Sequence, residues 1–231
     1  MFLGWLFVFL GILFSAAGTG LVVWGGSWLG YLALWPAASF FVVSAAYLRL
    51  GPRVLGKRPD GSLPLVRVLV LLPYFVFTWG IWHLLRLGAE HTYDLVAPDI
   101  YLGRLPLRRE LPDDVRLIVD LTAEFPRAAA RPDGCDYVNL PTLDAFVPGL
   151  DECEALVRSV AAHPGPVYIH CAQGHGRSAL VAGALMCLRG LASSADDAVA
   201  RMKRARPTVN LSSSQRAMLG ALCARLAPAR R

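Results

Sequence analysis

Three long apolar runs occupy the first part of the chain, at residues 2–24, 28–48 and 65–85. The first two contain no charged residue, and the third contains only Arg67, near one end. Each has about 20 residues, the length with which an α-helix crosses roughly 30 Å of hydrocarbon. Tryptophans lie near the predicted ends, as interfacial anchors do: Trp5, Trp24, Trp28 and Trp82. The pattern predicts a membrane region over residues 1–88 with about three transmembrane helices.

A different pattern begins after about residue 93, where short apolar runs alternate with helical periodicity. Strands are expected at residues 100–102, 115–121, 137–140 and 166–170. Helices are expected at residues 152–162, 177–188, 195–204 and 213–226. Ser193 or Ser194 can cap the third of these helices, and Ser212 or Ser213 the fourth. Such alternation predicts an α/β layer fold over residues 95–231.

Composition supports two regions with different surroundings. Hydrophobic residues make up 55% of the 231 residues, the mean hydropathy is +0.45 and the net charge is +6. A secretory signal is the competing interpretation of the first run, with a small-residue site at residues 15–17. No basic residue precedes that run and two more apolar runs follow it, which favours a multi-pass membrane protein, as in a bacterial inner membrane. We expect the bilayer as a partner and no nucleic acid.

The side of the membrane stays open. The loop at residues 49–64 carries four basic residues, which places it in the cytoplasm: Arg49, Arg53, Lys57 and Arg58. With three crossings, the α/β domain would then lie outside the cytoplasm. A reactive cysteine thiolate favours a reducing compartment instead. If one apolar run fails to cross, the side is reversed.

Five cysteines occur, and no two have the C-x2-C spacing of a zinc or thioredoxin-type site: Cys135, Cys153, Cys171, Cys187 and Cys223. The odd number leaves at least one thiol free. Most of them are expected to be small buried apolar residues. Cys171 is the exception because of the segment in which it lies.

That segment reads HCAQGHGRS over residues 170–178, between a predicted strand and a predicted helix. Its glycines allow the backbone to curl so that amide groups point inward, and the start of the helix adds positive potential. The result is a cradle for a phosphoryl group. The residues expected to form it are Ala172, Gln173, Gly174, His175 and Gly176.

The same potential would stabilise a thiolate, so Cys171 is the expected nucleophile at neutral pH. The planar guanidinium of Arg177 can hold two phosphoryl oxygens and stabilise charge in the transition state. The Ser178 hydroxyl can hydrogen-bond the sulfur and help it leave. His170 is expected to support the loop through hydrogen bonds to its carbonyl groups.

This C-x5-R-S pattern resembles the signature of the protein tyrosine phosphatase superfamily, particularly its dual-specificity branch. Four further segments are similar to that branch in the same order, at residues 98–103, 116–121, 140–144 and 198–209, the last with Arg206-Pro207. The resemblance covers about residues 97–226. It implies the cysteine-phosphatase fold, a central mixed sheet flanked by helices. It also implies a phosphatase that works through a phosphocysteine intermediate and without a metal or other cofactor.

The resemblance also implies a general acid, the aspartate of an "I-P-x-x-D" segment, which maps onto Asp144. Asp136 is the alternative. The lipid-acting mitochondrial phosphatidylglycerophosphate phosphatases resemble this chain around a "P-T-L-D" segment, and the resemblance implies an acid at the place of Asp136, ahead of that segment. Asp151 is a third candidate, with an N-cap as its structural role. A carboxylic acid in this place would protonate the leaving oxygen and then activate water.

The substrate class has two candidates. Phosphomonoesters on protein, phosphotyrosine with or without phosphoserine and phosphothreonine, are what the branch implies. A membrane lipid phosphate is the alternative, of the phosphatidylglycerophosphate or phosphoinositide type, because the spans place the site at a bilayer. The loop lacks the lysines of phosphoinositide-directed loops, which favours protein. A rhodanese-like sulfurtransferase and an inactive phosphate-binding module are the other function classes, and the presence of Arg177, Ser178 and Asp144 speaks against both.

Overall fold

The computed structural model describes residues 2–88, 90–107, 110–127 and 134–226. The chain divides into two compact units, and each is described by itself. Unit 1 comprises Met1–Arg58, Ser62–Ala89 and Ala123–Pro126, and unit 2 comprises Pro59–Gly61, Glu90–Thr122 and Arg127–Arg231.

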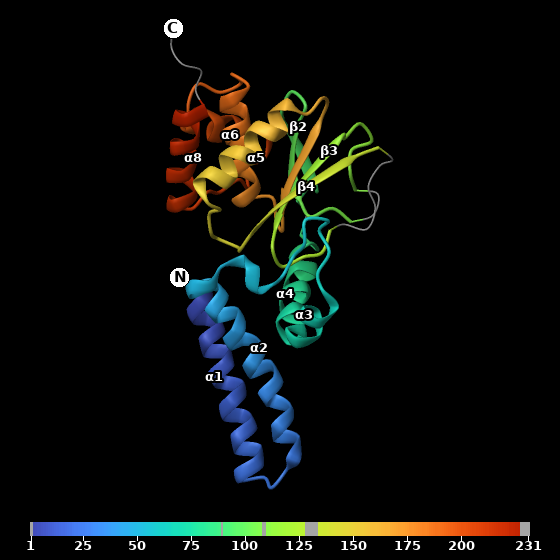
Figure 1. Cartoon of the computed structure of the whole chain (residues 1–231), viewed down its shortest axis with the longest axis vertical. Helices are drawn as coiled ribbons and strands as arrows, with labels where there is room; N and C mark the ends of the chain where they lie inside the picture. The colour runs from blue at the N-terminus through green and yellow to red at the C-terminus, as the bar shows by residue number, and fades with distance from the viewer. Residues whose placement is uncertain (1, 89, 108–109, 128–133, 227–231) are drawn as a thin grey trace. The chain divides into compact units, whose positions relative to one another are not determined.

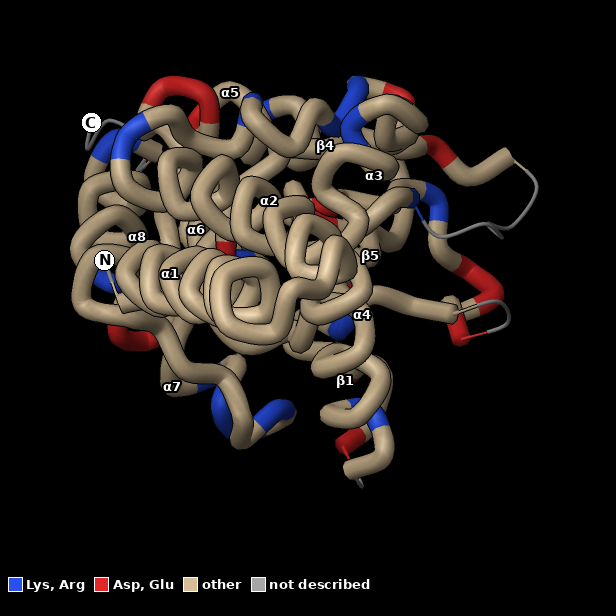
Figure 2. Tube along the Cα trace, turned by 90° about the horizontal axis from the view of Figure 1, so that it is seen from below, with Lys and Arg blue, Asp and Glu red and all other residues tan. Residues whose placement is uncertain are grey.

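Unit 1 begins with a helical hairpin. Helix α1 (Phe2–Val23) packs against a second helical stretch made of η1 (Trp28–Ala33), α2 (Leu34–Ala45) and η2 (Ala46–Leu50). The two come close where a Cβ at Gly18 would lie 2.6 Å from the Gly30 carbonyl oxygen, a contact that only glycine allows. Both helices carry no charge along most of their length (Figure 2). Phe2–Val23 and Trp28–Leu50 are long and apolar enough to cross a membrane.

The third expected span differs from the sequence prediction. A short turn, η3 (Pro52–Val54), comes first. Residues 65–85 then form two helices instead of one: α3 (Leu65–Val70) ends before Leu71, and α4 (Leu72–Leu85) begins after it. Pro73 lies in the first turn of α4, where its missing N–H is tolerated. Proline in a continuous helix would remove a hydrogen bond, so the break falls just before it. Helix α4 has only 14 residues, too few to cross about 30 Å.

Unit 2 is built on a five-stranded sheet with the order β1-β2-β5-β3-β4. Its strands are β1 (Tyr93–Ala97), β2 (Ile100–Arg104), β3 (Leu117–Thr122), β4 (Asp136–Thr142) and β5 (Val167–Cys171). Strand β1 is antiparallel to β2, and the other pairs are parallel. The mixed α/β fold expected from the sequence is confirmed. Strand β1 was not predicted, because this short edge strand interrupts its apolar residues with Asp94.

Four helices pack on one face of this sheet: α5 (Leu150–Ala162), α6 (Arg177–Leu188), α7 (Ala195–Ala205) and α8 (Ser213–Leu226) (Figure 1). Alternate strand residues such as Val119 and Ile169 enter the core under them, while Ile118 and Tyr168 join a smaller cluster on the opposite face. The side chain of Ser194 accepts a hydrogen bond from the Asp197 amide, and that of Ser212 from the Gln215 amide. These serines cap α7 and α8 as expected.

The cysteines need one correction. Cys187 on α6 and Cys223 on α8 form a disulfide, with Cα atoms 5.6 Å apart. Residues 36 apart on two helices leave no spacing signal, so the pattern could not reveal the pair. Cys135 and Cys153 are buried and lie outside this disulfide. Burial raises the pKa of Cys153 to about 12, which leaves that sulfur unreactive at neutral pH.

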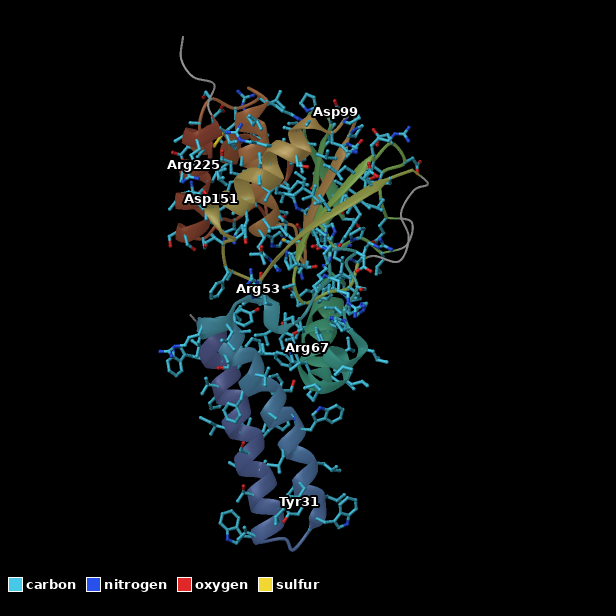
Figure 3. The ribbon with its side chains drawn as sticks, in the orientation of Figure 1. Tyr31, Arg53, Arg67, Asp99, Asp151 and Arg225 are labelled. Atoms are coloured by element: carbon cyan, nitrogen blue, oxygen red, sulfur yellow. A yellow bond between two sulfur atoms is a disulfide. The ribbon has the colours of Figure 1, made fainter. Side chains whose placement is uncertain are left out.

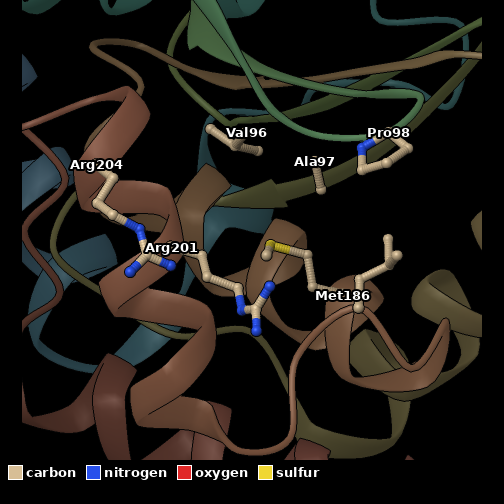
Figure 4. Close-up of a pocket in the computed structure, with 7 residues that line it drawn as sticks. Val96, Ala97, Pro98, Met186, Arg201 and Arg204 are labelled. Atoms are coloured by element: carbon tan, nitrogen blue, oxygen red, sulfur yellow. The ribbon is translucent and has the colours of Figure 1, made fainter.

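An open pocket of about 370 Å³ lies at the end of the sheet where the parallel strands begin. Its lining includes Pro98 from the β1–β2 turn, Met186 near the end of α6, and Arg201 and Arg204 on α7 (Figure 4). No residue of the segment 170–178 lines it. The chemistry expected of that segment has to be sought at the other end of the sheet.

Candidate active site

Cys171 is the last residue of the central strand β5, where the chain turns toward α6. Its side chain is buried, with 4% of the residue exposed. The sulfur accepts a hydrogen bond from the Gly174 amide at 3.3 Å and lies 3.3 Å from the Ser178 hydroxyl. Both groups can stabilise negative charge on the sulfur.

The loop after Cys171 depends on two glycines. Gly174 has a φ of +79°, and a Cβ there would come within 2.5 Å of the Gly103 backbone. A Cβ at Gly176 would lie 2.7 Å from the Gln215 amide oxygen. Gly176 directly precedes α6, so the positive end of this 12-residue helix faces the loop. A curled backbone next to a helix N-terminus is a suitable anion site.

Arg177 is the first residue of α6 and is almost fully buried. One terminal nitrogen donates to the Thr142 carbonyl at 2.7 Å, at the end of β4. The other lies 3.1 Å from the Asp144 carboxylate. The guanidinium therefore lies between the loop and the β4–α5 connection.

Asp144 comes from that connection, and its side chain is 61% exposed. Ala145, the next residue, has a φ of +62°, which is uncommon for a residue with a Cβ. The structure thus brings Asp144, Arg177 and Cys171 to one end of the sheet, although they come from different segments. An exposed carboxylate on a tight turn is free to approach a leaving group.

The other two aspartates considered for the acid lie elsewhere. Asp136 begins β4 and pairs in register with Leu117, which pairs with Val167 at the start of β5. It is therefore about four residues, or roughly 13 Å, from the row of Cys171. Its carboxylate hydrogen-bonds His163 at 3.0 Å instead.

Asp151 does not cap α5, since the N-cap is Gly149. It lies in the first turn of that helix, where its charge suits the helix dipole. Its carboxylate is 2.6 Å from Arg225 of α8, and the two side chains are labelled side by side in Figure 3. The N-cap expected from the sequence was wrong, because glycine occupies that place and Asp151 is two positions further on.

Arg206 holds the outer side of the loop. It is 1% exposed, and it donates to the carbonyl oxygens of Gln173 and Gly174, both at 3.1 Å. The Asn210 amide donates to the carbonyl of His175 at 3.0 Å. With these carbonyl groups held outward, the loop amides are left to face inward. Arg206 was noted in the sequence only as part of an arginine–proline turn, and its contacts to the loop were not foreseen.

Glu90 links Arg206 to the loop histidine. Its carboxylate lies 2.9 Å from His175 Nε2 and also accepts from Thr208 and pairs with Arg206. Burial alone would raise the pKa of Glu90, but the hydrogen bonds from Thr208 and His175 and the charge of Arg206 hold that pKa below its ordinary value. Glu90 is 85 positions from His175, so no sequence pattern indicated this contact. Thr142, which accepts from Arg177, was missed for the same reason.

A Glu90→Gln substitution is expected to lower the thermal midpoint of the protein at pH 7 by about 2–4 °C. The pKa of the Glu90 carboxyl is lower in the folded state than in the unfolded state, where it is about 4.3. The ionised carboxylate therefore stabilises the fold at pH values above about 4.3, and this contribution is lost as the pH falls through the folded-state pKa. The difference between parent and variant should therefore shrink by pH 3.5. Calorimetry at both pH values tests this, and a difference independent of pH would contradict it.

The remaining expected loop residues are in place around the sulfur. His170 is buried, and its Nδ1 is 3.4 Å from the Cys171 carbonyl. His175 is one-third exposed beside Glu90. Ala172 and Gln173 lie in the turn itself, and the Ala172 carbonyl accepts from the Leu105 amide. The arrangement is a curled loop with a cysteine at its start, an arginine at its end and a carboxylate nearby.

Unit 2 has the fold of the protein tyrosine phosphatase superfamily, in its dual-specificity form. Among solved structures, the chain is similar to human DUSP28, with 22% identity, a TM-score of 0.51, and coverage of 58% of this chain and 95% of that one. It is similar to PTPMT1 in complex with PI(5)P, with 21% identity, a TM-score of 0.51, and 58% and 96% coverage. It is also similar to a mutant form of Tk-PTP, with 26% identity, a TM-score of 0.50, and 58% and 96% coverage.

No family model matches this sequence, and no curated protein matches it. The fold expected from the C-x5-R-S segment is confirmed by the similarity to these solved structures. At these identities the common property is the fold, and the activity has to be argued from the site.

Proposed function

We propose that this chain is a membrane-anchored, cysteine-dependent phosphatase that hydrolyses phosphomonoesters, with a phosphatase domain over residues 95–231 and a membrane region over residues 1–88. The observation that carries the proposal is the buried Cys171 sulfur, which accepts from the Gly174 amide and lies next to Ser178 at the start of α6. A thiolate there can attack a phosphoryl group held by the loop amides and Arg177.

The reaction has two steps. In the first, the Cys171 thiolate attacks phosphorus in line, the S–P bond forms, and the P–O bond to the leaving group breaks as Asp144 donates its proton to that oxygen. In the second, the Asp144 carboxylate takes a proton from water, the water oxygen attacks phosphorus, and the S–P bond breaks. The Ser178 hydroxyl, 3.3 Å from the sulfur, donates a hydrogen bond to the departing thiolate.

Full-length protein in detergent should hydrolyse para-nitrophenyl phosphate in the presence of EDTA. The substrate class is then decided by comparing a phosphotyrosyl peptide with phosphatidylglycerophosphate in vesicles, at matched concentrations of accessible phosphate. We propose phosphotyrosine on protein, with or without phosphoserine and phosphothreonine, as the main substrate. Ala172, Gln173 and His175 stand where a phosphoinositide-directed loop would carry lysine, which supports that choice.

A lipid phosphate is the second candidate. The two long apolar helices would hold the domain at a bilayer, and PTPMT1, which shares the fold, is known in a complex with PI(5)P. Turnover of the vesicle substrate at least tenfold above the peptide would favour this candidate over the first.

Two crossings instead of three also give a consistent orientation. With α3 and α4 too short to span, the basic loop at residues 49–64 and the phosphatase domain lie on the same side, which the positive-inside rule makes the cytoplasm. That side is reducing, which suits a catalytic thiolate, whereas the Cys187–Cys223 disulfide is more typical of the periplasmic side. Protease digestion of right-side-out and inverted bacterial membrane vesicles tests this, and digestion of the domain from the periplasmic side would contradict it.

The variant Asp144→Asn is expected to lower kcat on phenyl phosphate by about 100-fold, because an amide cannot supply the proton of the first step. The same variant removes the carboxylate that lies 3.1 Å from Arg177, so inorganic phosphate should inhibit as well as, or better than, in the parent. Asp136→Asn is the control and should retain activity within twofold. The proposal for the acid fails if Asp136→Asn is the more damaging of the two.

A further inference from the structure

Three polar side chains lie in one row across the sheet, on the face opposite the helices. Asp120 of β3 pairs in register with Asn139 of β4 on one side and with His170 of β5 on the other. Their neighbours Val119, Val138 and Ile169 point into the helix-covered core. Since side chains alternate along a strand, these three share the other face. His170 directly precedes the proposed nucleophile.

Asp120 is the centre of this row and is fully buried. Its Oδ1 accepts from the Thr122 amide at 2.8 Å and from the Thr122 hydroxyl at 2.7 Å, and its Oδ2 accepts from the Tyr137 hydroxyl at 2.8 Å. His170 Nε2 lies 4.0 Å from Oδ1. A buried carboxylate needs such partners, and a shift of any one of them would move the others.

The Tyr137 hydroxyl keeps its proton. Burial and the charge of Asp120 raise the pKa of Tyr137 far above its ordinary value. This side chain therefore acts as a fixed donor to Oδ2 of Asp120, while Thr122 holds Oδ1, the oxygen that lies 4.0 Å from His170.

A short turn packs on this same hydroxyl. Pro59–Gly61 belongs to unit 2. The Pro59 carbonyl accepts from the Asn139 amide group at 3.1 Å, and the Gly61 carbonyl accepts from the Arg127 amide at 2.8 Å. Gly61 has a φ of +81°, and a Cβ there would collide with the Tyr137 hydroxyl. The turn is thus in direct contact with the group that holds Asp120.

We propose that the turn Pro59–Gly61 is a positioning element of the active site, which acts through Tyr137 and Asp120 on His170 and so on the reactivity of Cys171. The inference rests on the proposed function, because it concerns the same nucleophile. In the chain this turn follows the second apolar helix by a few residues.

The test compares two glycines of similar conformation. A Cβ in Gly61→Ala pushes on the Tyr137 hydroxyl and on Arg127 Cβ, whereas in Gly134→Ala, at a φ of +71°, it meets no atom of the described residues within 4 Å. A second pair is Tyr137→Phe and Tyr101→Phe, since the Tyr101 hydroxyl donates to the exposed Asp114 instead. Full-length protein in detergent is treated with iodoacetamide between pH 5 and pH 9, and alkylated Cys171 is quantified by mass spectrometry.

In Gly61→Ala and Tyr137→Phe, the alkylation curve of Cys171 should move to higher pH by about half a unit to one unit, and kcat should fall about tenfold with KM unchanged within twofold. The two controls should match the parent. Other charged or titratable groups lie beside the sulfur or its loop on neighbouring elements: Arg104, which pairs in register with Cys171, Arg177, Asp144, His175, Glu90 and Arg206. None of them is altered, so a moved curve reports on His170 and Asp120.

Alkylation curves of Gly61→Ala and Tyr137→Phe that coincide with the parent curve, with only the thermal midpoint lowered, would overturn the proposal. A parent that hydrolyses no phosphomonoester would overturn the proposed function. The positioning role is judged on the alkylation curve alone, so the two failures can be told apart.

Discussion

The variant Cys171→Ser is expected to lower kcat on para-nitrophenyl phosphate by about 10⁴-fold or more, the largest effect of any single substitution in this chain. The Gly174 amide and the Ser178 hydroxyl lie 3.3 Å from the Cys171 sulfur and can stabilise negative charge on it. A serine hydroxyl in the same place would stay protonated at neutral pH. In the proposed mechanism the phosphoenzyme forms only on this sulfur.

The matched control is Cys153→Ala, at a buried thiol on α5 that lies outside the loop. It should keep kcat within about threefold even if the thermal midpoint falls. Cys171→Ser should still bind inorganic phosphate, measured by calorimetry, because the amides of the loop and Arg177 remain. Turnover by Cys171→Ser within tenfold of the parent would show that another group is the nucleophile.

The parts of the site that are local in sequence were the predictable ones. A buried strand, a loop with two glycines and an apolar helix follow one another over residues 166–188, and the structure has β5, the loop and α6 in those places. The bounds expected for α6 and α8 agree with the observed helices. Here the periodicity and the conformational needs of glycine act within a few residues.

The contacts that hold the loop from outside were not predictable. Glu90 and Arg206 meet only because α7 and the segment before β1 are folded against the same loop, and neither has a neighbour in sequence that indicates the pairing. The broken third span is a similar case. The hydropathy of residues 65–85 is high enough for a membrane span. Pro73, however, has no backbone N–H and fits only in the first turn of a helix, so the apolar run is divided into two helices.

The arginine at the end of the loop carries the second large effect. Arg177→Lys is expected to lower kcat/KM by about 1,000-fold, although the charge is retained. The guanidinium reaches the Thr142 carbonyl with one nitrogen and the Asp144 carboxylate with the other. A planar group in this position can hold two equatorial oxygens of the transferring phosphoryl group, and the single ammonium of lysine cannot.

Arg189→Lys is the control, because Arg189 directly follows the same helix at its far end and its side chain donates to the Val160 carbonyl, away from the loop. It should retain kcat/KM within twofold. Steady-state kinetics with phosphotyrosyl peptide and inhibition by inorganic phosphate separate the two contributions of Arg177. A loss in kcat larger than the loss in phosphate affinity indicates that the guanidinium binds the transition state more tightly than the ground state. Equal losses in both, or a total loss below tenfold, would mean that the amide loop alone carries the charge and that Arg177 mainly holds the β4–α5 connection in place.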